Sequence, residues 1–231
     1  MTKRELSAVL LVVSATFGCS SGPLEPEQAS ANQEDGGMPS TADGGAVPSL
    51  VPDWVEYPPG PYGTKRGAVI ENLTFLGWKH PDATGYDVGQ FEKVRLSDFY
   101  NPDGRSDVKL LAVNASGVWC SVCRSEYEDM NKKGTYATYR PKGVEILGTL
   151  FEDNSYYPAQ PADLMRWGSV ANHAVKFPLG LDPGFKMGAY FSSDATPLNL
   201  LIDVRTMTIV QITMGYSPTY WESVQSLLAK M

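Results

Sequence analysis

Cys120 and Cys123, with two residues between them, constrain the fold of this chain more than any other feature. They follow the short apolar run 110–114, which has the length and character of a buried strand ending in a turn. From Arg124 to Lys133 charged residues alternate with apolar ones, and the pattern stops at Gly134. The sequence therefore predicts a helix that begins near Cys120, directly after a strand.

This position gives the two thiols different chemistry. Unpaired backbone N–H groups and the positive end of the helix dipole stabilise a thiolate in the first helical turn. We therefore expect Cys120 to be the nucleophile, and Cys123, about one turn further along, to resolve the mixed disulfide that forms at Cys120. Thr196 and Pro197 precede a second apolar run, and the two motifs together suggest a dithiol redox site.

Zinc binding and a purely structural disulfide are two other uses of a closely spaced cysteine pair. A structural zinc site needs four ligands, and besides the pair this chain offers only Cys19, His80 and His173. A secreted chain can keep a structural disulfide, but a link across two residues closes so small a loop that it removes little entropy from the unfolded chain. We therefore expect a redox-active pair that uses no metal ion and no cofactor.

Residues 1–19 have the features of a secretory signal. Lys3 and Arg4 precede a mostly apolar stretch from Leu6 to Phe17, which ends at Gly18-Cys19. About 12 apolar residues are too few for a membrane span, which needs about 20. A short apolar stretch behind a basic start is typical of a signal peptide.

The end of this segment resembles the lipobox of bacterial lipoproteins, in which the cysteine is lipidated and becomes the mature N-terminus. Thr16 and Phe17 differ from the residues that the motif prefers, so ordinary signal cleavage is the alternative. The resemblance implies a lipid anchor at Cys19. Ser20, in place of Asp, implies the outer membrane and the periplasmic side of the envelope. Lipidation would also leave a single even pair of cysteines, as expected for a disulfide that cycles in an oxidising compartment.

Composition separates a linker from a folded domain. Residues 20–52 are rich in Gly, Pro, Ser, Ala and acidic residues and contain no Lys, Arg or aromatic residue, so we expect a disordered tether. Residues 53–231 are sufficient for one domain with a substantial core. Much of the net charge of −7 lies before Asp53, so the domain is nearly neutral. Nothing in the charge pattern indicates the basic stripe of a nucleic-acid-binding protein.

The domain alternates strands and helices. The strand and helix of the cysteine motif are followed by a strand, a helix, two strands suited to antiparallel pairing and a final helix. The expected elements are a strand at 144–151, a helix near 161–172, strands at 198–203 and 208–214, and a final helix. Ser217 can cap this last helix, with Pro218 at its first position. Its apolar face would carry Trp221, Val224 and Leu228. This order predicts an α/β fold with a central mixed β-sheet flanked by helices.

The domain resembles the thioredoxin-like superfamily, and within it the redoxin and membrane-anchored disulfide reductase branch. The matching segments are Gly67–Gly77, Val94–Phe99, Val113-Asn114, Trp119–Cys123 with Glu126, and Thr196-Pro197. The resemblance implies a thioredoxin-like fold, a cis peptide bond before Pro197, and a substrate peptide that pairs with the backbone of Thr196. It also implies that Trp119, Thr196 and Pro197 face the substrate.

The sequence departs from the superfamily pattern at two places near the cysteines. Asn114 stands where cytosolic thioredoxins have a buried acid, so a carboxylate proton shuttle is missing from that position; the disulfide reductase branch commonly has Asn there. Ser121-Val122 lacks the usual proline, and the residues between the cysteines influence the redox potential. We interpret Glu126 as an exposed helix residue rather than a catalytic one.

The leading hypothesis is an extracytoplasmic thiol–disulfide oxidoreductase that acts on protein disulfides or dithiols and exchanges electrons with another redox protein. A thiol peroxidase of the redoxin type is one alternative, although such enzymes have a threonine where this chain has Gly117. A Sco-like copper metallochaperone is another, with His173 or His80 as the imidazole ligand. Its cysteines, however, are usually separated by three residues.

The aromatic residues that follow the second strand allow two interpretations. We expect residues 152–161 to form a loop beside the site, because of their Pro, Asn and Tyr content. Tyr156, Tyr157 and Trp167 either pack in the core and its rim or line a peptide groove.

Overall fold

The computed structural model describes residues 56–81, 85–169, 175–191 and 195–231. All of them belong to the unit Val51–Met231. The predicted signal and linker, Cys19 and His173 lie outside the described residues. Within the four described ranges, no helix combines the length and the apolar character that a membrane span requires.

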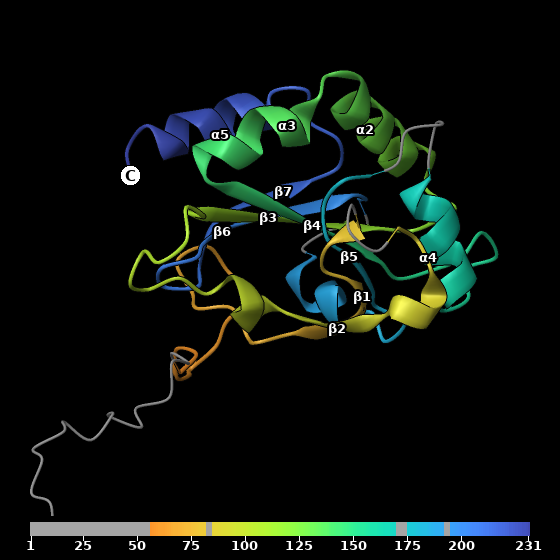
Figure 1. Ribbon diagram of the computed structural model, residues 1–231, viewed down its shortest axis with the longest axis horizontal. Helices are drawn as coiled ribbons and strands as arrows, with labels where there is room; N and C mark the ends of the chain where they lie inside the picture. Colours follow the sequence, from red (N-terminus) through yellow and green to blue (C-terminus); the bar gives the residue numbers. More distant parts are fainter. Residues whose placement is uncertain (1–55, 82–84, 170–174, 192–194) are drawn as a thin grey trace, which may run out of the picture. The chain divides into compact units, whose positions relative to one another are not determined.

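A single mixed β-sheet forms the centre of the domain (Figure 1). Its seven strands lie in the order β2-β1-β5-β4-β3-β6-β7. The strands are β1 Thr74–Trp78, β2 Glu92–Arg95, β3 Leu110–Ser116, β4 Val144–Leu150, β5 Leu179–Leu181, β6 Leu198–Asp203 and β7 Thr208–Met214. The three central strands β3, β4 and β5 are parallel, whereas β6 is antiparallel to both β3 and β7.

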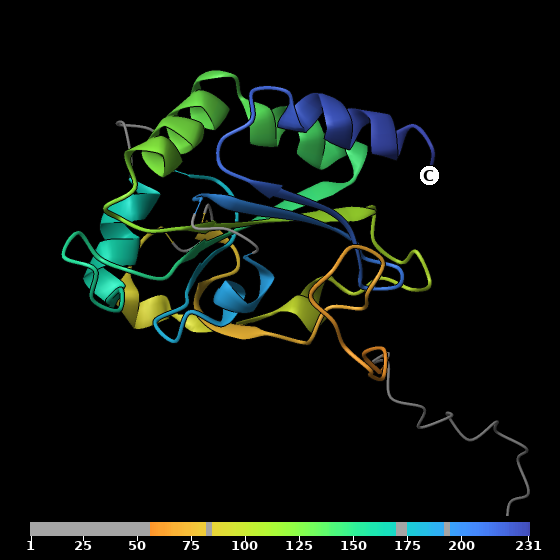
Figure 2. The same cartoon turned by 180° about the vertical axis from the view of Figure 1, so that it is seen from behind.

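Helices and short 3₁₀ turns cover the sheet. Figure 1 and the reverse view in Figure 2 show α2, α3 and α5 together over one face. The α-helices are α2 Ser121–Lys132, α3 Thr135–Tyr139, α4 Pro161–Gly168 and α5 Tyr220–Leu228. The 3₁₀ helices are η1 Val88–Gln90, η2 Leu96–Phe99, η3 Arg140–Lys142 and η5 Lys186–Tyr190.

Strand β3 divides the core into two layers, because its side chains alternate between the faces of the sheet. Leu110 and Ala112 pack with the helices α2 to α5 on one side. Leu111, Val113 and Ala115 pack on the other side with the segment before β1 and with η5. All seven residues of β3 are buried, as expected for a central strand with both faces covered.

The α/β fold with a mixed sheet flanked by helices is confirmed. The hairpin of β6 and β7 has the predicted bounds and antiparallel pairing. Two helix predictions were too long. α4 ends at Gly168, and α5 begins at Tyr220 with Thr219 rather than Ser217 as its N-cap. The backbone N–H of Tyr220 donates to the carbonyl of Ser217, so residues 217–219 form a turn ahead of the helix.

Candidate redox site

The two cysteines lie where the chain passes from the carboxyl end of β3 into α2. Cys120 is the N-cap of this helix, which begins at Ser121, as the sequence predicts. The two residues form a disulfide. The backbone N–H of Cys123 donates to Sγ of Cys120 at 3.0 Å. A thiolate formed at Cys120 would therefore keep a backbone donor as well as the favourable end of the helix dipole.

The two cysteines differ in solvent exposure. Cys120 is 4% exposed, whereas Cys123 is completely buried behind it. A partner molecule can approach only the first of them without rearrangement of the helix. This asymmetry agrees with the assignment of Cys120 as nucleophile and Cys123 as resolving residue.

The second predicted motif lies against the first. The peptide bond between Thr196 and Pro197 is cis, as the resemblance implied. Thr196 Oγ1 donates to Cys120 Sγ at 3.3 Å. The sheet topology produces this contact, because β6 begins immediately after Pro197 and pairs with β3, whose carboxyl end leads to the cysteines.

The interpretation of Glu126 as an exposed residue was wrong. Its side chain is only 3% exposed and lies on the buried face of α2, three residues after Cys123. Asn114 Nδ2 on β3 donates to Glu126 Oε2 at 2.8 Å, and Asn199 Nδ2 on β6 donates to Glu126 Oε1 at 3.0 Å. Position 114 has no carboxylate, but Glu126 on α2 places one beside it, and Asn114 holds that carboxylate by a hydrogen bond.

Burial sets the protonation of this carboxyl group. Removal from water favours the neutral form and raises the pKa of Glu126 to about 7, although the two asparagine hydrogen bonds favour the ionised form and act in the opposite direction. The sequence pattern does not reveal this residue, because a helix with many charged residues predicts a solvated face. A better signal is the spacing, since residues at i, i+3, i+4 and i+7 share one helix face and here comprise Cys123, Glu126, Tyr127 and Met130.

Trp119 is fixed beside the disulfide by its neighbours. Its Nε1 donates to Glu152 Oε2 at 2.8 Å, and its ring contacts that of Tyr156 with centroids 5.1 Å apart. Gly117 leaves room for the indole, because a Cβ at this position would lie 2.7 Å from Trp119 Nε1. The threonine that the peroxidase alternative requires at position 117 would therefore displace Trp119.

The aromatic residues divide between the two interpretations. Trp167 is 3% exposed and packs on Tyr127 in the core. Tyr156 and Tyr157 are 66% and 69% exposed, on the segment that follows β4. Loop 152–160 does lie beside the redox site, because Val118 N–H donates to the carbonyl of Glu152.

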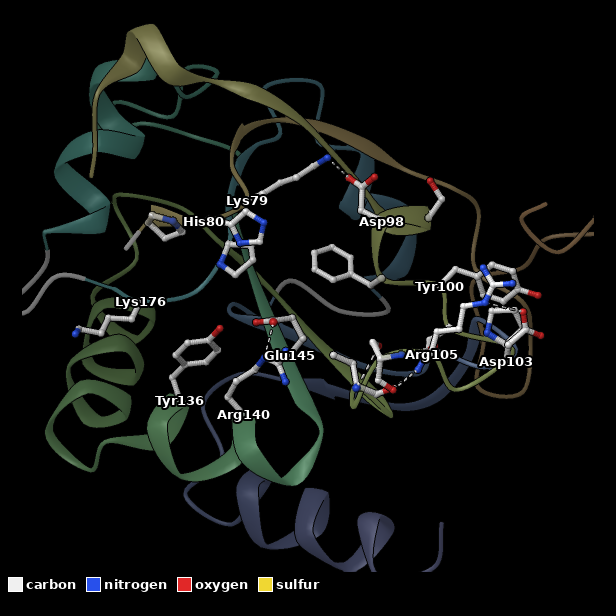
Figure 3. A pocket seen from close by; sticks show the side chains of 18 residues that line it. Lys79, His80, Asp98, Tyr100, Asp103, Arg105, Tyr136, Arg140, Glu145 and Lys176 are labelled. Carbon is white, nitrogen blue, oxygen red and sulfur yellow. Dashed lines mark hydrogen bonds and ion pairs between the residues drawn. The ribbon is translucent and has the colours of Figure 1, made fainter. Parts of the chain in front are cut away.

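A pocket of about 880 Å³ lies at the end of the sheet where the parallel strands begin, opposite the cysteines (Figure 3). Val108, Glu145 and Pro178, which line it, stand at or just before the amino ends of β3, β4 and β5. His80 also lines this pocket, far along the sheet from the cysteines. His80 therefore lies too far from the dithiol to bind the same copper ion as the two cysteines.

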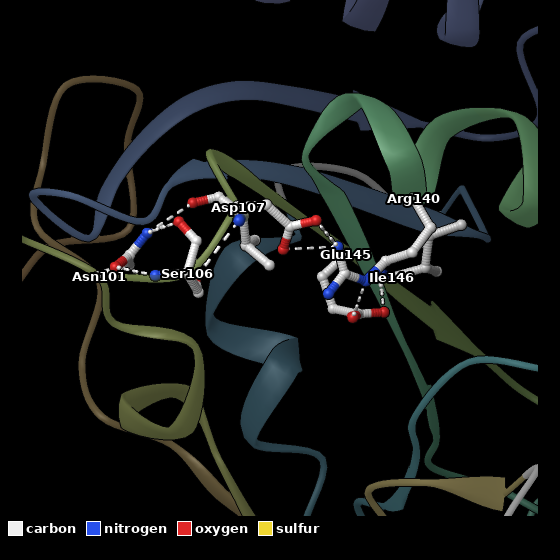
Figure 4. Close-up of polar contacts among 7 residues, drawn as sticks. Asn101, Ser106, Asp107, Arg140, Glu145 and Ile146 are labelled. Carbon is white, nitrogen blue, oxygen red and sulfur yellow. Dashed lines mark hydrogen bonds and ion pairs between the residues drawn. The ribbon is translucent and has the colours of Figure 1, made fainter. Parts of the chain in front are cut away.

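One wall of this pocket holds a buried charge. Glu145 accepts a hydrogen bond from the backbone N–H of Ile146 and forms an ion pair with Arg140 Nε at 3.0 Å (Figure 4). Arg140 Nη1 also reaches both carboxylate oxygens of Asp107 at 3.0 Å. Burial raises the pKa of Glu145 above its ordinary value. Arg140 thus links the loop before β3 to the start of β4.

Among the residues that the structure describes, none of those around the disulfide form a metal-binding cluster. No cluster of three or more His, Cys, Asp or Glu residues there has the geometry to hold a metal ion.

Comparison with known proteins supports the fold and the chemistry of the pair. No protein-family model matches the chain. It is 30% identical to the thiol-disulfide oxidoreductase ResA of Bacillus thuringiensis over 121 residues, 52% of this chain and 60% of that protein. The chain thus spans about 60% of the length of the curated relatives it matches.

Solved structures with the same fold cover more of the chain. A protein from Chlorobium tepidum assigned as the thiol:disulfide interchange protein DsbE matches 73% of this chain and 98% of its own, with a TM-score of 0.52 and 20% identity. A protein from Bacteroides thetaiotaomicron assigned as a protein disulfide isomerase matches 74% of this chain and 91% of its own, with a TM-score of 0.53 and 22% identity. The chain therefore has a thioredoxin-like fold and resembles thiol-disulfide oxidoreductases in sequence over about half its length.

Proposed function

We propose that this protein is a thiol–disulfide oxidoreductase that acts on protein substrates outside the cytoplasm. Cys120 is its nucleophile and Cys123 its resolving cysteine. The observation that carries the proposal is the contact between Thr196 Oγ1 and Cys120 Sγ, because it joins the dithiol at the start of α2 to the loop that ends in a cis proline.

The reaction in the reducing direction has two exchanges. The Cys120 thiolate attacks one sulfur of a substrate disulfide, so that a mixed disulfide forms and the other substrate sulfur leaves as a thiolate. The Cys123 thiolate then attacks the Cys120 sulfur, the intramolecular disulfide forms, and the second substrate thiolate leaves. Two electrons pass to the substrate, and a separate redox protein must return them. The oxidising direction is the reverse.

Glu126 supplies a base for the second exchange. Cys123 is completely buried, so its thiol has no direct route to bulk water for its proton. Glu126 follows it on the same buried helix face and has a pKa of about 7, close to the pH at which a general base is most effective. Asn114 and Asn199 hold both oxygens of this carboxylate in place.

Trp119, Thr196 and Pro197 form the substrate-facing surface around Cys120. Trp119 precedes the nucleophile in sequence and is half-buried, while Thr196 touches its sulfur. A polypeptide that presents a disulfide to Cys120 must pass over these residues. Protein thiols and disulfides are therefore the proposed substrates.

The proposed location rests on the N-terminal sequence. Residues 1–19 serve as a lipoprotein-type signal, Cys19 carries the lipid, and residues 20–52 tether the domain 53–231 to the periplasmic side of the outer membrane. Labelling cells with a radioactive fatty acid tests this, since the wild-type chain is expected to take up label and Cys19→Ala to lose it. An unlabelled wild-type protein would contradict the lipid anchor.

Reduction of insulin disulfides by the full chain, with dithiothreitol as the electron source, tests the activity. We expect Cys120→Ser to abolish turnover. Reduced Cys123→Ser, freed of dithiothreitol before insulin is added, should accumulate a mixed disulfide between Cys120 and insulin. Ser125→Ala, which alters an exposed residue of the same helix, serves as the matched control and should retain the full rate. Full activity in Cys120→Ser would refute the proposal.

The equilibrium reduction potential of the pair then decides the direction of electron flow. A value of about −270 mV indicates a reductant, and one of about −120 mV an oxidant of folding proteins. A pair that could not be reduced and reoxidised reversibly in the folded protein would be structural instead.

A further inference from the structure

Five aromatic side chains, four of them at least partly exposed and Phe151 buried at 3% exposed, form a chain of ring contacts that begins at the residue before the nucleophile. We call it the aromatic ledge; its members are Trp119, Phe151, Tyr156, Phe185 and Phe191. Neighbouring rings along it are in contact. The centroid distances are 5.1 Å for Tyr156–Trp119, 6.4 Å for Trp119–Phe151, 4.3 Å for Phe151–Phe185 and 5.3 Å for Phe185–Phe191.

The topology of the sheet brings these residues together. The strands β3, β4 and β5 are parallel, so their carboxyl ends lie at the same end of the sheet. Trp119 follows β3, Phe151 and Tyr156 follow β4, and Phe185 follows β5. Phe191 lies shortly before Thr196 in the chain. The ledge therefore extends from the redox site across the same end of the sheet.

The loop that carries Tyr156 is rigidly built. Asp153 Oδ1 accepts the backbone N–H groups of Ser155 and Tyr157 at 2.7 and 2.9 Å, and Asp153 N–H donates to the carbonyl of Tyr157. Glu152 of the same loop holds the indole of Trp119. The loop thus fixes both rings of the Tyr156–Trp119 contact.

The loop that carries Phe185 is built in the same way. Asp182 is completely buried, and its two carboxylate oxygens accept the backbone N–H groups of Lys186 and Met187, each at 2.9 Å. Phe185 N–H donates to the carbonyl of Asp182. Two unrelated loops therefore use an aspartate to hold one aromatic residue each.

Both aromatic residues have a backbone conformation that such side chains rarely adopt. Tyr156 has φ of 65° and Phe185 has φ of 47°, in the left-handed region. This conformation costs a non-glycine residue free energy. Burial does not offset this free-energy cost, because the side chain of Tyr156 remains 66% exposed and that of Phe185 39% exposed. The cost is therefore borne by residues that keep apolar surface available to a partner.

We propose that the aromatic ledge is a specificity surface, which binds an apolar or aromatic side chain next to the reacting cysteine of a polypeptide substrate. The inference rests on the proposed function and adds to it a preference among substrates. Its occupant is the substrate chain, because Trp119, the first member of the ledge, is the residue directly before Cys120, to which the substrate becomes covalently linked. Aromatic side chains are well suited to such contacts, since they bury large areas and lose little conformational entropy on binding.

Single-turnover kinetics with the reduced full chain test the proposal. The substrates are two disulfide-linked peptides that differ only in a Phe or a Ser beside the cysteine, and hydroxyethyl disulfide as a small reference. The variants are Tyr156→Ala and Phe185→Ala, with Tyr156→Phe as the conservative change. Tyr157→Ala is the matched control, because Tyr157 is equally exposed but its ring has no aromatic contact among the described residues.

We expect the wild-type protein to reduce the Phe peptide about tenfold faster than the Ser peptide, as a buried aromatic contact implies. Tyr156→Ala and Phe185→Ala should lose most of this preference and keep the wild-type rate on hydroxyethyl disulfide. Tyr156→Phe and Tyr157→Ala should keep the preference.

Three results would overturn the inference. The first is equal rates for the two peptides in the wild-type protein, and the second is an unchanged preference in both alanine variants. The third is an equal loss on hydroxyethyl disulfide, which would mean that the residues act on the dithiol itself. Failure of the proposed function would differ from all three, because the wild-type protein would then reduce none of the disulfides.

Discussion

Replacement of Glu126 by glutamine should remove a pH dependence from the stability of the oxidised protein. The pKa of this carboxyl is about 7 in the folded state, against 4.5 for an ordinary glutamate. The folded protein therefore binds the proton more tightly than the unfolded chain does. The resulting stabilisation is fully present below about pH 4.5 and is lost as the pH rises to about 7.

The size of the effect follows from the two pKa values. Their difference corresponds to about 3 kcal/mol in the free energy of unfolding. Glu126 is 3% exposed, so solvent screening reduces this value little. The glutamine variant keeps the shape of the side chain but cannot ionise, so it should lack this component. One amide hydrogen bond to Asn114 or Asn199 will be lost, which lowers its stability by a similar amount at every pH.

Urea unfolding at a series of pH values between 4.5 and 8 measures the prediction. The free energy of unfolding of the wild-type protein minus that of Glu126→Gln should fall by about 3 kcal/mol across this range, as the wild-type protein loses its protonated form. Glu128→Gln is the matched control, because it removes an exposed carboxyl group two residues away on the same helix. A difference between wild type and Glu126→Gln that stays constant with pH would refute the assignment of a raised pKa to this residue.

Substitutions of Gly77 and Gly117 test the packing of the sheet and of the redox site, and a substitution of Gly184 is the control. Gly77→Ala would place a Cβ 2.0 Å from a backbone oxygen of the neighbouring strand β5, so it should lower the free energy of unfolding by roughly 1–3 kcal/mol. Gly184→Ala, where no atom lies within 4 Å of the added Cβ, should leave stability unchanged in the same urea titration. Gly117→Ala should displace the indole of Trp119 and shift its Nε1–H resonance in an NMR spectrum, whereas an unmoved resonance would contradict the close contact between them.

The parts of the fold that the sequence predicted depend on local patterns. The run at 110–114 and the hairpin of β6 and β7 are recognisable because apolar residues continue for the length of a strand and stop at turn-forming residues. The position of Cys120 at a helix start follows from the same reasoning. The contact of Thr196 with Cys120 required the family resemblance, since no local pattern relates two such distant positions.

The parts that the sequence did not predict depend on contacts between distant elements. Glu126 is buried because Asn114 on β3 and Asn199 on β6 both face it, and neither partner is near it in the sequence. For a similar reason, the sequence does not decide whether Tyr156 packs in the core or lines a groove. Its ring meets Trp119 only because β3 and β4 are adjacent and end at the same edge.

The two outermost strands bear on the risk of aggregation. A bare sheet edge can accept an added strand from another polypeptide chain. At one edge, β2 consists largely of exposed charged residues. At the other, the backbone of Gly67, Ala68 and Ile70 pairs with Met207 and Ile209, which covers the start of β7. The charges on β2 and the cover over the start of β7 thus discourage another chain from adding a strand to the sheet at these positions.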